Sequence, residues 1–529
     1  MSADLEPNRH CPEVVVGEHK LRCQDVASVA ARSSKVTLSD NPAFRARLAR
    51  SAAVIAERVE RAVPTYGVNT GFGASVRNSV PLEAATKLAQ NLPRYHGCGV
   101  GPFLTREQSR AVLLLRANSL AAGYSGVRPA LIERLIALLQ HDILPLIPSR
   151  GSVGASGDLT PLSYVAALVC GERRAHSPET GAIVDAAQAL AAAGIEPLQL
   201  LPKESLALMN GTSVMAALSC MACERAAQLA DSACALTALC VDALAGQRAH
   251  YDARLFLAKP HPGQAKAAAR IRAYLGERRA PASREARIQE RYSLRCAPHV
   301  IGVLEDVLPF CRGVLETEIN GASDNPLIDP DTGDVLHGGN FYGGHVAIVA
   351  DTLKTAVAHV AELLERQLIL LNAPETNNGL PENLVGVSGA DRFAHHGFKA
   401  MELTASALTA EALKLSLPAS VWSRSTEGHN QDIVSMGMHA ALDLVQVVEL
   451  SETVAAVHAM AAAQAMELRG LQYTSQELAA VHSALRKHSA LVCDDRPLDV
   501  EIAAVTECLR DGKLTSAAAM QDAPRSDNL

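Results

Sequence analysis

Hydrophobic side chains recur at intervals of three and four residues through long stretches of this chain of 529 residues. Such spacing places apolar side chains along one face of an α-helix. It predicts helices over residues 109–121, 128–139, 209–246, 345–370, 397–415 and 443–466. The predicted fold class is therefore mainly α, with a long central helix bundle.

Glycine- and asparagine-rich segments interrupt the helical pattern at residues 66–73, 151–157, 318–326 and 338–344. Glycine permits turns and close backbone approaches that other residues do not. We therefore expect these interruptions to carry most of the chemistry.

Three regions are expected along the chain. A mixed N-terminal region over residues 1–205 bears the first two of these loops, and a long-helix bundle spans residues 206–470. A C-terminal helical segment follows over residues 471–529, and its polar end at residues 521–529 predicts a mobile tail.

Composition narrows the class of protein. A hydrophobic content of 48% is enough for the extensive core of a large enzyme. The formal net charge of -7 supplies no overall basic surface, so nucleic acid is not an expected partner. Apolar stretches are broken by charged or polar residues before they reach membrane length, so no membrane partner is expected either.

The twelve cysteines are scattered, and the start of the chain lacks a basic region followed by an apolar signal segment. These features predict a cytoplasmic location. Cys220 and Cys223 have the spacing of a metal or redox pair, but no second pair matches them, which favours structural thiols. His337 and His345 lack the spacing of a helical two-histidine site, so no metal site is expected.

The most informative segment is Gly151–Pro161, which contains the tripeptide Ala155, Ser156 and Gly157. Because Gly157 has no Cβ, its amide nitrogen can approach the Ala155 carbonyl. Cyclisation and two dehydrations would leave a conjugated five-membered ring whose exocyclic methylene comes from Ser156. For the tripeptide alone, an ordinary Gly/Ser-rich loop is the commoner interpretation. A serine-hydrolase elbow is disfavoured, because the Gly-x-Ser-x-Gly spacing is missing.

Other motifs accompany this one at residues 66–73, 206–213, 289–298, 318–327, 337–343 and 495–498. Together they resemble the methylidene-imidazolone (MIO)-dependent aromatic amino acid ammonia-lyase and aminomutase family, which includes histidine, phenylalanine and tyrosine ammonia-lyases. The resemblance implies the ammonia-lyase/fumarase-like fold and a homotetramer with shared active sites. It also implies that MIO forms autocatalytically from Ala155, Ser156 and Gly157, with Asp158 in its environment and no metal or dissociable cofactor.

Tyr66 begins the first of these motifs. The resemblance gives it the role of the base that removes a substrate β-proton. An ordinary tyrosine has a pKa of about 10, so this role requires donors or positive charge that stabilise the phenolate. Taken alone, Tyr66 would more often be a packing residue.

Tyr292 and Arg295 lie in the motif at residues 289–298. A guanidinium can hold a substrate carboxylate through two roughly parallel hydrogen bonds. The resemblance assigns that role to Arg295 and places Tyr292 in the catalytic surroundings, where it could donate or relay a proton. His299 stands where many relatives have glutamine, and a surface salt bridge is the ordinary interpretation of an isolated Arg295.

Two amides and one aromatic ring complete the expected pocket. Asn210 and Asn325 can donate hydrogen bonds without a charge that titrates during turnover. By resemblance, Asn210 lies beside the prosthetic ring, Asn325 lies near the substrate carboxylate, and Phe341 packs against the ring. As isolated residues, the asparagines would more often be helix or turn caps.

Substrate choice is expected to rest on four residues. By resemblance, Tyr95 and His96 contact the substrate ring, and a histidine in this pair serves a phenol or an imidazole. Gln431 stands where histidine lyases commonly carry glutamate, which disfavours histidine. Glu427 matches the glutamate that phenylalanine enzymes of the family carry at this position. Related tyrosine enzymes often have an amide there, so Glu427 weakens the prediction of tyrosine. The resulting order of substrates is tyrosine, phenylalanine and histidine.

The implied reaction converts L-tyrosine to trans-4-coumarate and ammonia, so the chain is predicted to be a carbon–nitrogen lyase. Phenylalanine and histidine ammonia-lyases stay open as alternatives. So does a 2,3-aminomutase, because loop closure and residence time decide whether ammonia returns to the product. A noncatalytic helical scaffold is a further alternative, disfavoured by the intact Tyr66 and tripeptide.

Overall fold

The computed structural model describes residues 13–177, 180–277 and 288–515, which form two compact units. The first unit contains the described residues up to Met221, with Arg312–Ala350 and Pro418–Leu442. The second contains Ala222–Cys311, Asp351–Leu417 and the described residues from Asp443 onward. The tail predicted at residues 521–529 lies outside the described ranges.

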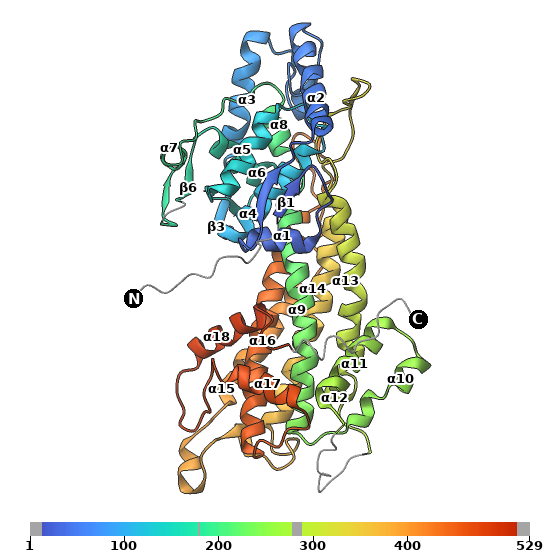
Figure 1. Cartoon of the computed structure of the whole chain (residues 1–529), viewed down its shortest axis with the longest axis vertical. Coiled ribbons are helices and arrows are strands. Elements are labelled where there is room, and N and C mark those ends of the chain that lie inside the picture. The colour runs from blue at the N-terminus through green and yellow to red at the C-terminus, as the bar shows by residue number, and fades with distance from the viewer. Residues whose placement is uncertain (1–12, 178–179, 278–287, 516–529) are drawn as a thin grey trace. The chain divides into compact units, whose positions relative to one another are not determined.

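Helices dominate the described chain, and every stretch with the helical pattern forms one (Figure 1). They are α4 (Arg106–Ala121), α5 (Pro129–Gln140), α9 (Ser213–Ala243), α14 (Gly344–Asn372), α15 (Lys399–Leu415) and α16 (Gly437–Leu468). The predicted mainly α fold class is confirmed.

Local sequence explains where these helices begin. The Thr105 hydroxyl accepts a hydrogen bond from the Gln108 amide at 3.2 Å, and the Gln108 side chain accepts one from the Thr105 amide at 2.9 Å. This reciprocal capping satisfies donors that the first turn of α4 leaves unpaired. Pro129 occupies the first position of α5, where its missing N–H costs no hydrogen bond.

The first unit contains further helices, namely α1 (Cys23–Ala30), α2 (Pro42–Glu60), η1 (Gly73–Arg77), α3 (Leu82–His96), α6 (Leu159–Val169), α7 (Ala186–Ala192) and α8 (Glu204–Met209). Of these, α3, α6 and α8 pack against one another. Helix α1 packs against α4, which also packs against α5.

Every described strand lies in the first unit, in small sheets that fasten loops. The parallel pair joins β1 (Glu13–Val16) to β2 (Lys35–Leu38). The antiparallel pairings join β3 (Val100–Phe103) to β5 (Pro148–Arg150), β6 (Arg174–His176) to both β4 (Leu144–Pro145) and β7 (Ile183–Asp185), and β8 (Leu327–Ile328) to β9 (Val335–Leu336).

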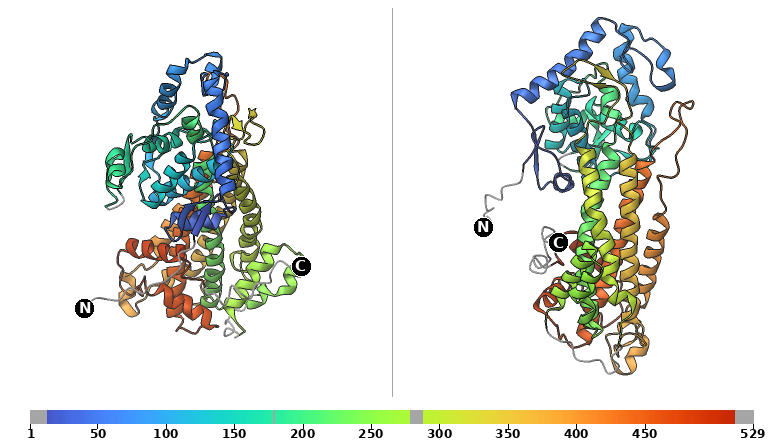
Figure 2. Two further views of the ribbon diagram at one scale, coloured as in Figure 1. Left: turned by 45° about the horizontal axis from the view of Figure 1, so that its top comes forward. Right: turned by 90° about the vertical axis from the view of Figure 1, so that its right-hand side faces the viewer.

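In the second unit, the long helices α9, α13 (Ala297–Ile319), α14 and α16 run side by side as a bundle (Figures 1 and 2). Polar side chains also join them, as in the Lys354–Asp443 ion pair between α14 and α16. The remaining elements are η2 (Arg248–Tyr251), α10 (Ala253–Ala258), α11 (Pro262–Leu275), α12 (Tyr292–Arg295), η3 (Glu382–Leu384), η4 (Gly389–Ala394), α17 (Gln476–Leu485) and α18 (Asp499–Arg510).

Both compact units draw on separate stretches of sequence, because helices α9, α13, α14 and α16 each contribute residues to both. The division into residues 1–205, 206–470 and 471–529 follows sequence order, and as a set of domain limits it stays a prediction. Among the described helices, none is both long and apolar enough to cross a membrane.

Candidate active site

The loop that carries the tripeptide connects β5 to α6 and bends sharply. Gly154, Ser156 and Gly157 have φ angles of 78°, 51° and 75°. Such left-handed backbone is readily adopted by glycine and strained for serine. The fold therefore holds Ser156 in an unfavourable conformation within the expected reactive segment.

Gly157 lies directly against Gly211, which precedes α9. The two residues form a parallel bridge, and the Asp158 amide donates to the Gly211 carbonyl at 2.7 Å. A Cβ on Gly157 would lie 2.1 Å from the Gly211 carbonyl oxygen, so no larger residue fits without movement of the backbone. This contact explains the need for glycine at position 157.

Asp158 fastens the loop to the start of α9. Its buried carboxylate accepts hydrogen bonds from the amides of Val214 and Met215 at 3.0 and 2.9 Å. Burial raises the pKa of Asp158 to about 7, although these amides favour the ionised form. Asp158 therefore uses the unpaired amides of the first helical turn to fix the loop.

A cavity of about 840 Å³ in the first unit opens beside this loop. Its lining includes most of the predicted site residues, namely Tyr66, Tyr95, His96, Ala155, Ser156, Asn210, Asn325, Phe341, Glu427 and Gln431. Gly157 and Asp158 lie next to the lining residues in sequence and do not line the cavity themselves. The structure thus brings together loops that are far apart along the chain.

Tyr66 has one partner that favours its phenolate. Its hydroxyl oxygen accepts a hydrogen bond from the Gly73 amide at 2.9 Å, which lowers the pKa. Burial raises the pKa of Tyr66 more strongly, and the negative charge of Glu427 raises it further. The net shift is upward, so the resting side chain is a neutral phenol near pH 7.

Asn210 presents an unpaired acceptor at the cavity. Its side-chain amide donates to the Asn325 carbonyl at 2.9 Å and to Asp324 at 3.3 Å. Its buried Oδ1 has no hydrogen-bond partner among the described residues. An orphaned acceptor on a residue that lines the same cavity as Ser156, together with the close contact between Gly157 and Gly211, fits a polar ring built from the tripeptide.

The residues predicted to contact the substrate ring lie at the end of α3 and in the loop after residue 425. The rings of Tyr95 and His96 have centroids 4.5 Å apart, and burial lowers the pKa of His96. Gln431 is held by Thr426, whose hydroxyl donates to the Gln431 side-chain oxygen at 2.9 Å. The amide oxygen is therefore engaged within the loop.

A family model for aromatic amino acid lyases matches residues 21–487. The chain belongs to this family. A histidine ammonia-lyase of Anaeromyxobacter dehalogenans is 40% identical over 503 residues, which cover 93% of this chain and 98% of that protein. A tyrosine ammonia-lyase of Cupriavidus metallidurans is 37% identical over 526 residues, covering 96% and 97%.

Solved structures agree with the sequence comparison. The tyrosine aminomutase of Streptomyces globisporus superposes with a TM-score of 0.88 at 34% identity, covering 95% of this chain and 97% of that one. The protein is thus a member of the MIO-dependent ammonia-lyase and aminomutase family, with the ammonia-lyase/fumarase-like fold. Its ammonia-lyase class comprises carbon–nitrogen lyases that act on aromatic amino acids.

Two predicted site residues of this aromatic amino acid lyase lie elsewhere. Tyr292 and Arg295 belong to the second unit and do not line the cavity. The Tyr292 side chain is 73% exposed, and the Arg295 guanidinium lies 4.6 Å from its ring centroid. Arg295 also donates to the Glu290 carbonyl at 3.0 Å. Tyr292 is thus exposed and Arg295 is half-buried, so part of this segment is open to another molecule.

Sequence reasoning missed a network of buried charged side chains that contacts Asn210. The Lys203 ammonium lies 2.5 Å from Asp324, and both side chains are fully buried. Arg116 donates to the carbonyls of Asn210 and Ser323 at 3.2 and 3.0 Å. Burial lowers the pKa of Lys203 and lowers that of Arg116 to about 10.

The sequence offered one signal for this network. Asp324 lies within the asparagine-rich break at residues 318–326, next to Asn325. Lys203 and Arg116 come from distant segments and match no motif. Only the fold shows that Arg116 donates to the Asn210 carbonyl and that Lys203 pairs with Asp324, the residue before Asn325.

Proposed function

We propose that this protein is an aromatic amino acid ammonia-lyase whose preferred substrate is L-tyrosine, which it converts to trans-4-coumarate and ammonia. One observation carries the proposal. A single cavity is lined by the serine of the tripeptide, by Tyr66 and by the ring-recognition pair Tyr95 and His96. These residues are what the reaction needs on one surface: an electrophile precursor, a base and contacts for the ring.

Ala155, Ser156 and Gly157 are the proposed source of MIO, which supplies an electrophile that makes the substrate nitrogen a better leaving group. The left-handed φ angles of Ser156 and Gly157 and the tight contact at Gly211 support that assignment. Asn210 and Phe341 line the same cavity and are proposed to surround the group. Asp158 fixes the loop through its hydrogen bonds from the first turn of α9.

Tyr66 is the proposed base that takes the substrate β-proton. Because burial and Glu427 raise its pKa, only a small fraction is phenolate near neutral pH. The Gly73 amide stabilises that fraction. Turnover should therefore rise with pH as Tyr66 loses its proton.

Arg295 and Asn325 are the proposed contacts of the substrate carboxylate, with Tyr292 nearby to donate or relay a proton. Asn325 lines the cavity, whereas Arg295 and Tyr292 lie in the second unit. The homotetramer with shared active sites, implied by the family, lets an exposed segment of one copy serve another. This assembly and a cytoplasmic location are parts of the proposal.

The polar groups near the ring site favour tyrosine. With its pKa lowered by burial, His96 is a neutral imidazole, which can hydrogen-bond to a phenol. The Gln431 oxygen is engaged by Thr426, and the remaining N–H groups of that amide suit a phenol oxygen. An uncharged amide also lacks the negative charge that would pair with an imidazolium.

Histidine is the second candidate substrate, favoured by the 40% identity to a histidine ammonia-lyase. A 2,3-aminomutase outcome is favoured by the likeness to a tyrosine aminomutase. The same cavity serves all three reactions, since they begin with the same attack and proton removal.

The test incubates the purified enzyme separately with L-tyrosine, L-phenylalanine and L-histidine and resolves the products by mass spectrometry. The proposal expects coumarate and ammonia from tyrosine at the highest kcat/KM. Faster formation of urocanate or cinnamate would correct the substrate. A β-amino acid that appears before free acrylate would make the enzyme an aminomutase, and no product from any substrate would overturn the proposal.

A further inference from the structure

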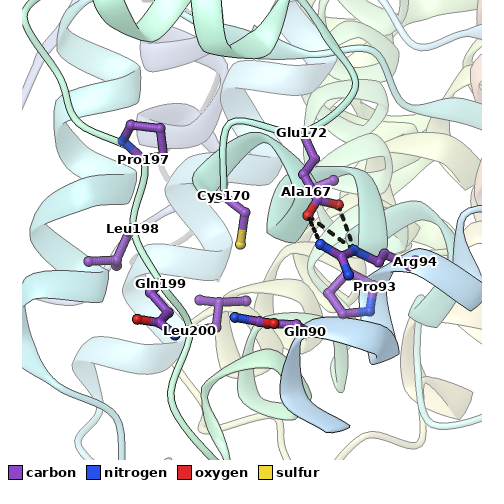
Figure 3. Close-up of a pocket in the computed structure, with 10 residues that line it drawn as sticks. All are labelled: Gln90, Pro93, Arg94, Ala167, Cys170, Glu172, Pro197, Leu198, Gln199 and Leu200. Atoms are coloured by element: carbon purple, nitrogen blue, oxygen red, sulfur yellow. Dashed lines mark hydrogen bonds and ion pairs between the residues drawn. The ribbon is translucent and has the colours of Figure 1, made fainter. Parts of the chain in front are cut away.

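Helix α3 separates two cavities in the first unit. Tyr95 and His96, at its C-terminal end, line the large cavity of the candidate active site. Gln90, Pro93 and Arg94 line a second, smaller cavity of about 220 Å³ (Figure 3). Contacts that fix α3 on the side of the smaller cavity therefore also fix the position of Tyr95 and His96.

Arg94 is held on that surface by Glu172. The Arg94 Nε lies 3.1 and 3.2 Å from the two carboxylate oxygens, and its Nη2 lies 2.5 Å from one of them (Figure 3). A guanidinium that meets a carboxylate through two nitrogens is fixed in orientation as well as position. The ion pair thus fixes the residue directly before Tyr95.

Arg173 holds the residue directly after His96. Its Nη2 donates to the Gly97 carbonyl at 3.0 Å, and its guanidinium lies 4.6 Å from the centroid of the Tyr164 ring. A Cβ on Gly97 would lie 1.6 Å from that Nη2, so the arginine passes where any side chain would stand. Arg173 itself has a φ of 69°, a strained conformation that the surrounding contacts must maintain.

Glu172 and Arg173 are tied to the reactive loop by α6. This helix of 11 residues begins at Leu159, two residues beyond Gly157, and ends at Val169. Its rise of about 1.5 Å per residue makes it a rigid spacer of roughly 16 Å. One end therefore carries the tripeptide loop, and the other carries the two residues that grip the end of α3.

We propose that Glu172 and Arg173 are positioning residues that determine ring selectivity, because they fix Tyr95 and His96 at a set distance from the reactive loop. The inference rests on the proposed function, in which this pair contacts the substrate ring. Discrimination between rings requires a hydroxyl or imidazole to meet its partner at hydrogen-bond distance, so a small shift of α3 reduces it.

The exposure of the Arg94–Glu172 pair separates this role from a structural one. The two side chains are 53% and 37% exposed, and exposed ion pairs contribute little to folding stability. Removal of the pair should leave the chain folded and the reactive loop intact, while the end of α3 gains freedom. Selectivity is then the property that changes.

The experiment measures kcat/KM for L-tyrosine and L-phenylalanine in wild type, Glu172→Gln and Arg173→Gln. We expect the ratio between the two substrates to fall by about fivefold in each variant. The absorbance of the prosthetic group should be retained. Asp331→Asn is the matched control, because Arg50 and Asp331 form another exposed ion pair of the same unit at 3.0 Å, and its ratio should equal that of wild type.

Exchange of the two charges supplies the rescue. Arg94→Glu combined with Glu172→Arg should restore much of the ratio that Glu172→Gln loses. An unchanged ratio in both single variants, while wild type turns over, would overturn this inference alone. Equal losses for both substrates would also overturn it, since they indicate a structural role. No product from wild type with any aromatic amino acid would overturn the proposed function and this inference together.

Discussion

The loop at residues 151–158 and the segment at residues 289–298 both carry motifs of the family, but the fold treats them differently. The loop is fixed by backbone contacts to Gly211 and by the Asp158 carboxylate, which accepts hydrogen bonds from backbone amides at the start of α9. Tyr292, in the other segment, is mostly exposed. Both segments therefore carry motifs that predict family membership. Only the loop at residues 151–158 contributes residues to the lining of the cavity.

The difference follows from what each segment must do. A backbone that cyclises needs strained φ angles and close neighbours, which a single unit of the chain supplies. A guanidinium that binds a carboxylate needs only access to it, and a half-buried side chain such as Arg295 keeps part of that access. The proposed chemistry thus joins a preorganised loop to an accessible arginine.

The largest expected effect comes from Ser156→Ala in the locked loop. Loss of the methylene source should lower kcat by at least about a thousandfold. Steady-state kinetics and the absorbance of the prosthetic group check this outcome. Ser163→Ala, which removes a buried serine hydroxyl of α6 away from the cavity lining, is the control and should stay active. Wild-type activity in Ser156→Ala would sink the assignment of the tripeptide.

Tyr66→Phe tests the base within the same cavity. Loss of the phenol should reduce kcat by about 10²- to 10⁴-fold, because water removes a β-proton poorly. The prosthetic absorbance should persist, since Tyr66 is not part of the tripeptide. Unchanged turnover would move the base to another residue.

Arg295→Gln tests the exposed segment directly. If Arg295 binds the substrate carboxylate, kcat/KM should fall by about 10- to 100-fold. Arg291→Gln alters another half-buried arginine of that segment and should have little effect. Equal kinetics for Arg295→Gln and wild type would contradict the proposed role of Arg295 in carboxylate binding. The residues that act on the substrate would then all come from the first unit.

His96→Leu tests ring recognition at the end of α3. An apolar residue removes the hydrogen-bond partner of a phenol, so the preference should shift from tyrosine toward phenylalanine by about tenfold. The ratio of kcat/KM for the two substrates measures the shift. If the ratio does not move, His96 has no part in selecting the ring.

Glu427→Gln should give the smallest effect, on the pH profile. The Glu427 carboxylate raises the pKa of Tyr66, so removal of its charge lowers that pKa. Since the phenolate is the active form, the ascending limb of kcat against pH should move to lower pH. A shift to higher pH would contradict the roles given to both residues.

Sequence predicted the parts of the fold and site that depend on local pattern. The helices follow from apolar spacing, and the missing Cβ of Gly157 permits a close backbone approach, which the structure shows against Gly211. The distant partners could not be predicted in this way. Lys203 and Asp324 meet as a buried ion pair, and Glu427 accepts from the Ala74 amide at 2.9 Å, because the fold brings separate segments together.

The exposure of Tyr292 and the half-buried setting of Arg295 were also beyond sequence reasoning. Their motif resembles a catalytic segment, but burial depends on which surfaces pack against it, and no local pattern encodes that. The upward shift in the pKa of Tyr66 arises likewise from burial and from a carboxylate far away in sequence. Both properties required the structure.

The most direct test of the central claim is mass spectrometry of the proteolytic peptide that contains Ala155, Ser156 and Gly157 from active enzyme. We expect a mass lower than the sequence mass by two water molecules, because cyclisation leaves the mass unchanged and each of the two dehydrations that follow removes one water from this loop. A peptide of unmodified mass from enzyme that turns over an aromatic amino acid would contradict the account.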